Sequence, residues 1–406
     1  MTALDERSLT AAGKWVVPGF VDLHAHLREP GFEESETIAT GARAALRGGF
    51  VTVCAMPNTE PAIDSPGLVA EILSRAGAAR GARVLPIATI TRRRAGRELA
   101  DLLELSAAGA VAFSDDGSPV SDASLFRHAL EYARARDLLV IEHPQDLALS
   151  GSGVMHEGVT SARLGLPGVP SAAEEVAVAR DLEIAELVGA RLHLTHLSTA
   201  GSIALVRAAK KDGIRVTCDV TPHHLAMTDE WVGGSRALAW EDEGPRGSPY
   251  DASTKVNPPL RPLADVRALW QGLADGTVDA IATDHAPHAS PKKDVEYDQA
   301  AFGISGIETA LSLILGGVAA GWCDRETALR ALAAGPAAIL ALTRNDDWIA
   351  IDPDAEWTVT ADTLTSLGKN TPLLGRKLRG RVITAAVDGE VRYEGGVRGA
   401  TPARSR

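Results

Sequence analysis

Five short apolar runs, spread over most of the chain, each end in a residue that can bind a metal ion. The first run contains His24 and His26, and positions i and i+2 of a β-strand face the same side. Both imidazole rings would therefore face one site, as two nitrogen ligands of a single ion do. A barrel is the simplest fold that gathers several strand ends around one centre. The other four runs end in Ser114-Asp115-Asp116, Glu142-His143, Thr195-His196 and Thr283-Asp284-His285.

The rest of the sequence alternates short extended runs with longer stretches rich in Ala, Leu, Arg and Glu, a pattern typical of a parallel sheet flanked by helices. An open doubly wound sheet is the alternative, but the Gly-x-Gly-x-x-Gly turn expected after its first strand is missing. We therefore predict a (β/α)8 TIM-like barrel over residues 16–345. The expected helices include Ser65–Ala79, Gly96–Ala107, Leu125–Arg136, Ser171–Val188 and Ala200–Lys211.

The pattern of the sequence changes after residue 346: helix signals become sparse, and short extended runs are separated by Asp, Pro and Gly. Asp388-Gly389 lies between two such runs and predicts a tight hairpin. We expect residues 346–406 to form a small β segment packed against the barrel. Residues 1–15 would be a remnant of the same small β domain.

Composition excludes several classes of protein. The net charge of −12 argues against a general nucleic-acid binder, which would carry a basic patch. Cys54, Cys218 and Cys323 are isolated, so neither a disulfide framework nor a cysteine-based zinc site is supported. No apolar run reaches the roughly 18 residues of a spanning helix, and the first residues do not have the pattern of a signal peptide. We expect a cytoplasmic protein with no membrane partner.

Several longer motifs resemble those of dihydroorotases, within the amidohydrolase superfamily. The similarity runs from about residue 12 to about residue 396. It implies a metal-dependent barrel enzyme that interconverts dihydroorotate and N-carbamoyl-aspartate in pyrimidine biosynthesis. It also implies a homodimer and aspartate carbamoyltransferase as a partner. The motifs are Pro18–Gly31, Met56–Thr59, Thr221–Leu225, Asn257–Arg261, Ala282–His288 and Phe302–Ile304.

The resemblance implies a centre of two zinc ions and a catalytic role for Asp284. A bound zinc ion lowers the pKa of its water to about 7 and makes it a nucleophile at neutral pH. Asp284 would act both as a ligand and as the group that carries a proton to the leaving amide nitrogen. By resemblance, His24, His26 and Asp284 hold one ion, His143 and His196 hold the other, and Asp116 bridges them.

Some of these assignments compete with plainer ones. Asp116 lies in a Ser-Asp-Asp-Gly-Ser-Pro stretch that would also serve as a turn, and only the resemblance selects it over Asp115. His193 and His196 have an odd spacing, so they face opposite sides of a strand. We favour His196 because Ser198-Thr199-Ala200 follows it as a helix cap. For the tandem pair His223 and His224, structural support is favoured over ligation.

The absence of lysine from a long part of the chain limits which members of the superfamily it can resemble. No lysine lies between Lys14 and Lys210. Hydantoinases, dihydropyrimidinases and many dihydroorotases bridge their metals with a carboxylated lysine on a mid-barrel strand, and this chain cannot. Asp116 fits the lysine-free subgroup of dihydroorotases, in which a carboxylate replaces that lysine.

The substrate is a small anion, so an acidic chain must provide local cations or donors for it. Arg28 lies two residues past His26, and its guanidinium could hold a carboxylate through two hydrogen bonds. The plainer role for Arg28 is a salt bridge to Glu29 or Glu33, and for Asn257 it is a turn. The expected substrate-binding residues are His26, Arg28, Asn58, Asn257, His288 and the backbone of Phe302 and Gly303.

Besides a structural or binding protein with an incidental metal, two other functions remain open from the sequence. One is another cyclic-amide hydrolase such as an allantoinase, which the Arg28, Asn58 and His288 set and the missing lysine disfavour. The other is a non-catalytic dihydroorotase-like subunit that scaffolds aspartate carbamoyltransferase. Such subunits have lost metal ligands, whereas every expected ligand is present here.

Overall fold

The computed structural model describes residues 13–343 and 346–395. Within them, eight parallel strands form one sheet in the order β11-β10-β9-β6-β5-β4-β3-β2. The two outer strands meet, since Ala25 bridges His285 and the N–H of His26 donates to the C=O of His285 at 2.8 Å. The sheet is therefore a nearly closed barrel, as predicted. Its strands are β2 (Phe20–Ala25), β3 (Phe50–Ala55), β4 (Arg83–Ala88), β5 (Ala112–Phe113), β6 (Leu139–Glu142), β9 (Arg191–Leu194), β10 (Val216–Val220) and β11 (Ala280–Ile281).

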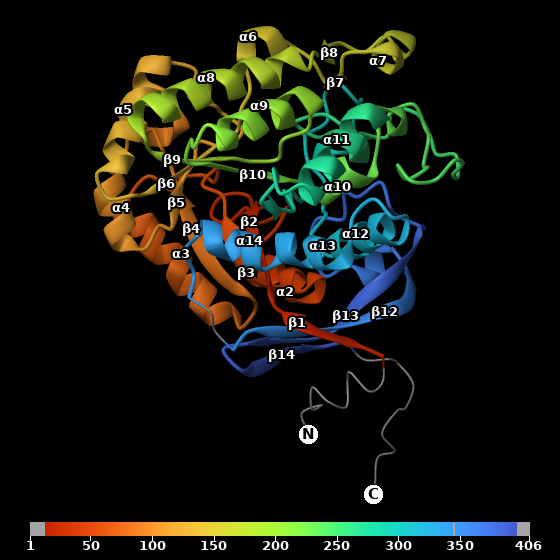
Figure 1. Ribbon diagram of the computed structural model, residues 1–406. Helices are drawn as coiled ribbons and strands as arrows, with labels where there is room; N and C mark the ends of the chain where they lie inside the picture. The colour runs from red at the N-terminus through yellow and green to blue at the C-terminus, as the bar shows by residue number, and fades with distance from the viewer. Residues whose placement is uncertain (1–12, 344–345, 396–406) are drawn as a thin grey trace, which may run out of the picture.

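Helices cover the outside of the barrel (Figure 1). Helix α2 shows why they form where they do: the side chain of Thr37 caps its first turn, Gly49 ends it with φ +93°, and three of its four alanines are buried. The outer helices are α2 (Ile38–Gly48), α3 (Pro66–Ala79), α4 (Leu102–Ala108), α5 (Ala123–Arg134), α8 (Ala172–Val188), α9 (Ala200–Lys211), α11 (Leu263–Ala274), α12 (Ala310–Ala319), α13 (Arg325–Leu332) and α14 (Ala334–Ile339).

The helix expected from Gly96 begins only at Leu102. The residues before it turn back on themselves, because Gly96 has φ +62° and the N–H of Arg92 donates to the C=O of Glu98. Asp101 then caps the helix by accepting from the N–H of Glu104. Short elements fill the loops, namely β7 (Met155–His156), β8 (Gly168–Val169), α6 (Leu147–Ser150), α7 (Val159–Leu164) and α10 (Pro222–Ala226).

A second, antiparallel sheet lies beside the barrel at the lower edge of Figure 1. Its order is β1 (Trp15–Pro18), β12 (Trp348–Thr358), β13 (Lys377–Val387) and β14 (Glu390–Glu394), so both ends of the chain contribute to it. The predicted hairpin is present: Asp388 and Gly389 have φ of +53° and +75° between paired Val387 and Glu390. Residues 1–12 and 396–406 of the two predicted terminal segments lie outside the described residues.

Side chains fill the barrel from within. Leu23, Cys54, Ile87 and Ile141 come from four different strands and belong to one buried cluster, which they can do only inside the barrel. Ile339 of α14 joins this cluster and closes the amino ends of the strands. In the part of the chain that the structure describes, no helix combines the length and apolar character needed to cross a membrane.

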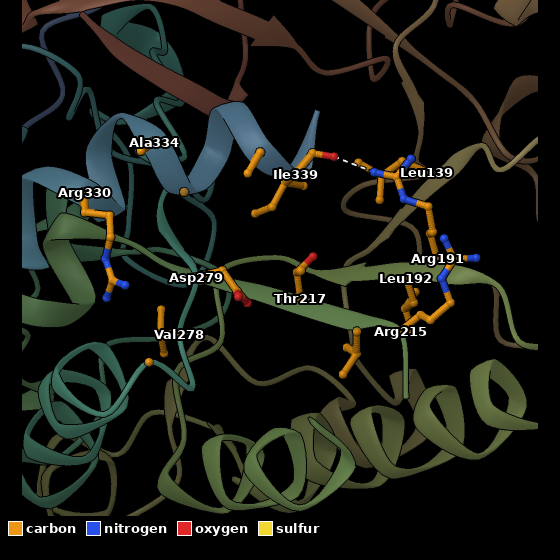
Figure 2. A pocket seen from close by; sticks show the side chains of 14 residues that line it. Leu139, Arg191, Leu192, Arg215, Thr217, Val278, Asp279, Arg330, Ala334 and Ile339 are labelled. Atoms are coloured by element: carbon orange, nitrogen blue, oxygen red, sulfur yellow. Dashed lines mark hydrogen bonds between the residues drawn. The ribbon is translucent and has the colours of Figure 1, made fainter. Parts of the chain in front are cut away.

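A pocket of about 600 Å³ lies at these amino ends (Figure 2). Arg191 and Arg215 lie on one side of it and Arg330 on the other, and Arg191 donates to the C=O of Ile339 at 2.6 Å. Its lining contains neither histidine nor cysteine. The predicted ligands lie at the opposite ends of the strands.

Close packing between α2 and the loop after β11 gives a stability prediction. A Cβ on Gly48 would lie 2.2 Å from the backbone oxygen of Ile307, which cannot rotate away. Gly48→Ala should lower the free energy of unfolding by about 1–3 kcal/mol, measured by denaturant titration. Gly77→Ala in α3 is the matched control, since nothing lies within 4 Å of its Cβ position. It should be neutral or stabilise by about 0.4–1 kcal/mol, and equal losses in the two variants would contradict the packing argument.

Candidate metal centre

Two histidines and one aspartate meet at the junction of the first and last barrel strands. Nε2 of His24 and Nε2 of His26 lie 3.3 Å apart. Oδ1 of Asp284, which follows β11, lies 3.1 Å from Nε2 of His26 and 3.6 Å from that of His24. All three side chains are buried, and their atoms are close enough to share one metal ion.

A second group lies next to the first. Nδ1 of His143, after β6, lies 2.9 Å from Nε2 of His196, after β9. Both nitrogens lie 3.5 Å from Oδ1 of Asp116. The other oxygen of Asp116, Oδ2, lies 3.4 Å from Nε2 of His24 and 3.6 Å from Nε2 of His26. Asp116 therefore stands between two pairs of histidines with one oxygen toward each pair.

The donor set fits metal ions. The ring nitrogens of His24 and His26, and those of His143 and His196, approach within hydrogen-bond distance. If these nitrogens carry no proton, their electron pairs face the same space, and a metal ion between them would bind both. Oδ1 of Asp116 is buried and has no hydrogen-bond partner among the described residues. Imidazole and carboxylate are typical zinc ligands, and an unpartnered buried oxygen is costly unless something binds it.

Groups behind the rings fix how they face the centre. Nδ1 of His26 lies 2.8 Å from Oδ1 of Asn58, and Nε2 of His143 lies 2.8 Å from Oε1 of Gln145. Both oxygens only accept hydrogen bonds, so each ring carries its proton there. The opposite nitrogens are thereby left with free lone pairs toward the centre, as metal-ligating histidines require.

The carboxylates dominate the electrostatics of the centre. Burial alone would lower the pKa of His24, but the charges of Asp116 and Asp284 outweigh it and raise that pKa to about 10, unless a metal ion takes the place of the second ring proton. Burial would raise the pKa of Asp116, but His24, His143 and His196 hold it well below the usual range. This is an environment that attracts positive charge.

Two of the predicted ligands have strained backbones. His196 and Asp284 have φ of +42° and +44°, a region that residues other than glycine rarely adopt. Buried carboxylates hold the backbone at or beside them: the N–H of His196 donates to Asp219 at 2.6 Å, and the N–H of Thr283, the residue before Asp284, donates to Asp22 at 2.9 Å. Such strain is concentrated at functional sites.

The structure separates the residue pairs that the sequence left open. Asp115 faces away from the histidines and accepts from the N–H groups of Ile90 and Thr91 at 2.9 and 3.1 Å. Both ring nitrogens of His193 are taken by other partners, Asp219 and Thr217, each at 2.8 Å, and His193 is not part of the metal-binding groups. Thr199 caps α9 as expected.

The expected substrate-binding residues lie near the centre but already have partners. Nε of Arg28 donates to the C=O of Pro287 at 3.1 Å, and its Nη2 lies 3.2 Å from Nε2 of His288. That ring nitrogen also lies 2.7 Å from the C=O of Phe302. Burial lowers the pKa of Arg28 to about 10, so it stays a cation at neutral pH.

The two remaining residues of that set bond within the chain. Nδ2 of Asn257 donates to Oε1 of Gln145 at 2.9 Å. The N–H of Gly303 donates to the C=O of Lys255 at 2.8 Å, and its C=O accepts from Asn370 at 2.9 Å. Their roles toward a substrate stay predictions.

Sequence reasoning missed the supporting residues Asp22, Gln145, Thr195 and Asp219. Asp22 had a usable signal, because it lies two residues before His24 in the same alternation. Asp219 had another, since it is the only charged residue inside the otherwise uncharged run Val216–Val220. Gln145 and Thr195 had none that distinguishes them from ordinary loop residues.

Comparisons with known proteins identify relatives of this chain. Residues 13–202 match the family described as "Dihydro-orotase-like". A dihydroorotase of Anaeromyxobacter sp. (strain K) is 51% identical over 399 residues, which are 97% of this chain and 89% of that protein. A dihydroorotase of Pelotomaculum thermopropionicum is 49% identical over 391 residues, 94% of this chain and 88% of that protein.

Solved structures resemble the fold at lower identity. The L-hydantoinase of Arthrobacter aurescens aligns with a TM-score of 0.78 and 22% identity, over 94% of this chain and 86% of that one. A D-hydantoinase from Thermus sp. aligns with a TM-score of 0.74 and 22% identity, over 95% and 87%. The sequence relatives, together with the buried cluster of histidines and aspartates, identify the chain as a member of the dihydroorotase family of metal-dependent amidohydrolases.

Proposed function

We propose that this dihydroorotase works with two zinc ions, one held by His24, His26 and Asp284 and the other by His143 and His196, with Asp116 as the bridge. The observation that carries the proposal is the position of Asp116, whose two oxygens face separate histidine pairs. When bound, the ions would supply a nucleophilic water at neutral pH and polarise the substrate carbonyl.

The reaction opens the ring of dihydroorotate. The oxygen of water bonds to the carbonyl carbon of the cyclic amide, and the bond from that carbon to the ring nitrogen breaks. Of the two protons of the attacking water, one reaches the departing nitrogen and the other is released to solvent, giving the ureido and carboxylate groups of N-carbamoyl-aspartate. Ring closure runs through the same steps in reverse.

Asp284 is the group proposed to carry that proton. Its Oδ1 is turned toward His24 and His26, whereas its Oδ2 has no hydrogen-bond partner within the described ranges. An oxygen that is free in this way can accept a proton from the attacking oxygen and then donate it to the nitrogen.

Arg28, Asn58, Asn257 and His288 would bind the substrate's carboxylate and amide edges, with His26 and the backbone of Phe302 and Gly303 beside them. Arg28 carries the argument, because its guanidinium is the cation next to His288 at the mouth of the centre. A guanidinium matches a carboxylate with two parallel hydrogen bonds. The homodimer, the aspartate carbamoyltransferase partner and the cytoplasmic location stay predictions.

The direct test is hydrolysis of dihydroorotate by the purified full chain, with allantoin as the alternative substrate and the zinc content measured on the same sample. We expect turnover of dihydroorotate only, and two zinc ions per chain. A single ion at full activity would overturn the bridged centre.

Exchange of neighbouring aspartates tests the bridge. Asp116→Asn should lose at least one zinc ion per chain, because an amide has no negative charge to share between two cations. Asp115→Asn should keep its zinc and instead lose about 1–3 kcal/mol of unfolding free energy, since two buried N–H groups lose a charged acceptor. Metal analysis and thermal unfolding of both variants check this, and the reverse pattern would refute it.

Asp284→Asn tests the proton transfer. With zinc in saturating excess, kcat should fall by about 10²–10⁴-fold, because an amide can neither accept nor deliver the proton. Zinc content must be measured on the assayed sample. Near-normal turnover at full occupancy would reduce Asp284 to a ligand.

Arg28→Gln should raise the KM for dihydroorotate by about 10–100-fold, the loss expected for a hydrogen bond between charged groups, while zinc content stays unchanged. Arg28→Lys, which keeps the charge but not the paired donors, should recover only part of this. An unchanged KM in both variants would remove Arg28 from the binding site.

A further inference from the structure

Beneath the metal centre lies a buried polar group that takes no part in the proposed chemistry. Asp219 of β10 and His193 of β9 are both fully buried, and Oδ2 of Asp219 lies 2.8 Å from Nε2 of His193. A buried carboxylate is costly unless its hydrogen-bonding capacity is satisfied. Asp219 meets this need with three donors, and two of them lead to metal ligands.

The first connection runs to His24. Oγ1 of Thr195 lies 3.1 Å from Oδ2 of Asp219 and 2.8 Å from Nδ1 of His24. A hydroxyl has one proton, and an ionised carboxylate can only accept, so the Thr195 proton points to Asp219. Thr195 must then accept from Nδ1–H of His24. That places the ring's free lone pair on Nε2, the atom that faces Asp116 and Asp284.

The second connection runs to His196 through the main chain. Oδ1 of Asp219 accepts from the N–H of His196 at 2.6 Å. His196 has φ +42°, a conformation that a histidine adopts only when its surroundings hold it. The hydrogen bond to a charged acceptor provides that hold and fixes where the chain leaves β9, and with it the position of the ring.

We propose that Asp219 is a positioning residue for both halves of the metal centre: through Thr195 it orients His24, and through the main chain it sets His196. The inference rests on the proposed two-metal centre. It also gives His193 a role, as the donor that occupies the remaining side of the Asp219 carboxylate. Outer hydrogen bonds of this kind typically change metal affinity by about 10–100-fold.

The test measures the affinity of the full-length chain for Zn²⁺ by competition with a chelator, beside thermal unfolding of the metal-free protein. In Asp219→Asn the amide turns a donor toward one of the three donors around it, so affinity should fall by about 10–100-fold. Thr195→Val removes the connection to His24 together with one donor to Asp219, leaves the hydrogen bond from the N–H of His196 in place, and should lose affinity. Thr195→Ser keeps the hydroxyl and should retain the affinity.

Asp279→Asn is the matched control. Asp279 also accepts an N–H of β10, that of Cys218 at 2.8 Å, but at the end of the strand away from the metal centre. It should lower the unfolding temperature and leave zinc affinity unchanged. If Asp219→Asn behaves in the same way, Asp219 supports only the fold and the inference is overturned.

The threonine pair decides the matter if Asp219→Asn does not fold. Equal zinc affinity in Thr195→Val and Thr195→Ser would overturn the inference while leaving the metal centre intact. A wild-type chain that binds no zinc would overturn both the centre and this inference, so the two failures are distinguishable.

Discussion

The burial of two carboxylates among four imidazole rings is the interaction on which the rest of this structure depends. Asp116 and Asp284 are removed from water at the carboxyl ends of the barrel strands. Charges in such a place need partners on every side, and positive ions are the partners that four ring nitrogens can share with them. The surrounding network, from Asn58 to Asp219, holds the rings so that this compensation is possible.

Much of the fold could be predicted because periodic patterns carry it. Alternating extended and helical stretches gave the barrel, and Asp388-Gly389 gave the hairpin of the small sheet. The late start of α4 could not be seen, since a positive φ at Gly96 and the backbone hydrogen bond between Arg92 and Glu98 outweigh the helix-forming residues there. Helix propensity is a weak preference that tertiary contacts override.

The site also contains residues that a local pattern reveals and residues that only the folded structure reveals. His24 and His26 could be found from spacing alone, because both belong to one strand. The choice of Asp116 over Asp115 could not, since either fits a turn. Only their contacts separate them: Asp116 faces the histidines, whereas Asp115 accepts from the N–H groups of Ile90 and Thr91. Asp219 and Thr195 contact the ligands across strands, and no local pattern encodes a contact between residues so far apart in sequence. The hydantoinase structures share the fold at 22% identity, whereas the dihydroorotase relatives at about half identity show the family.

The filled interior of the barrel limits how substrate, product and metal ions can reach the metal centre. Side chains from the strands and Ile339 of α14 fill the barrel at the amino ends of the strands, so the barrel is closed at that end. Substrate, product and metal ions must therefore enter and leave on the side of the carboxyl ends. In a reversible reaction, each product molecule leaves by the path along which the next substrate arrives. A molecule on that path therefore delays both hydrolysis and ring closure.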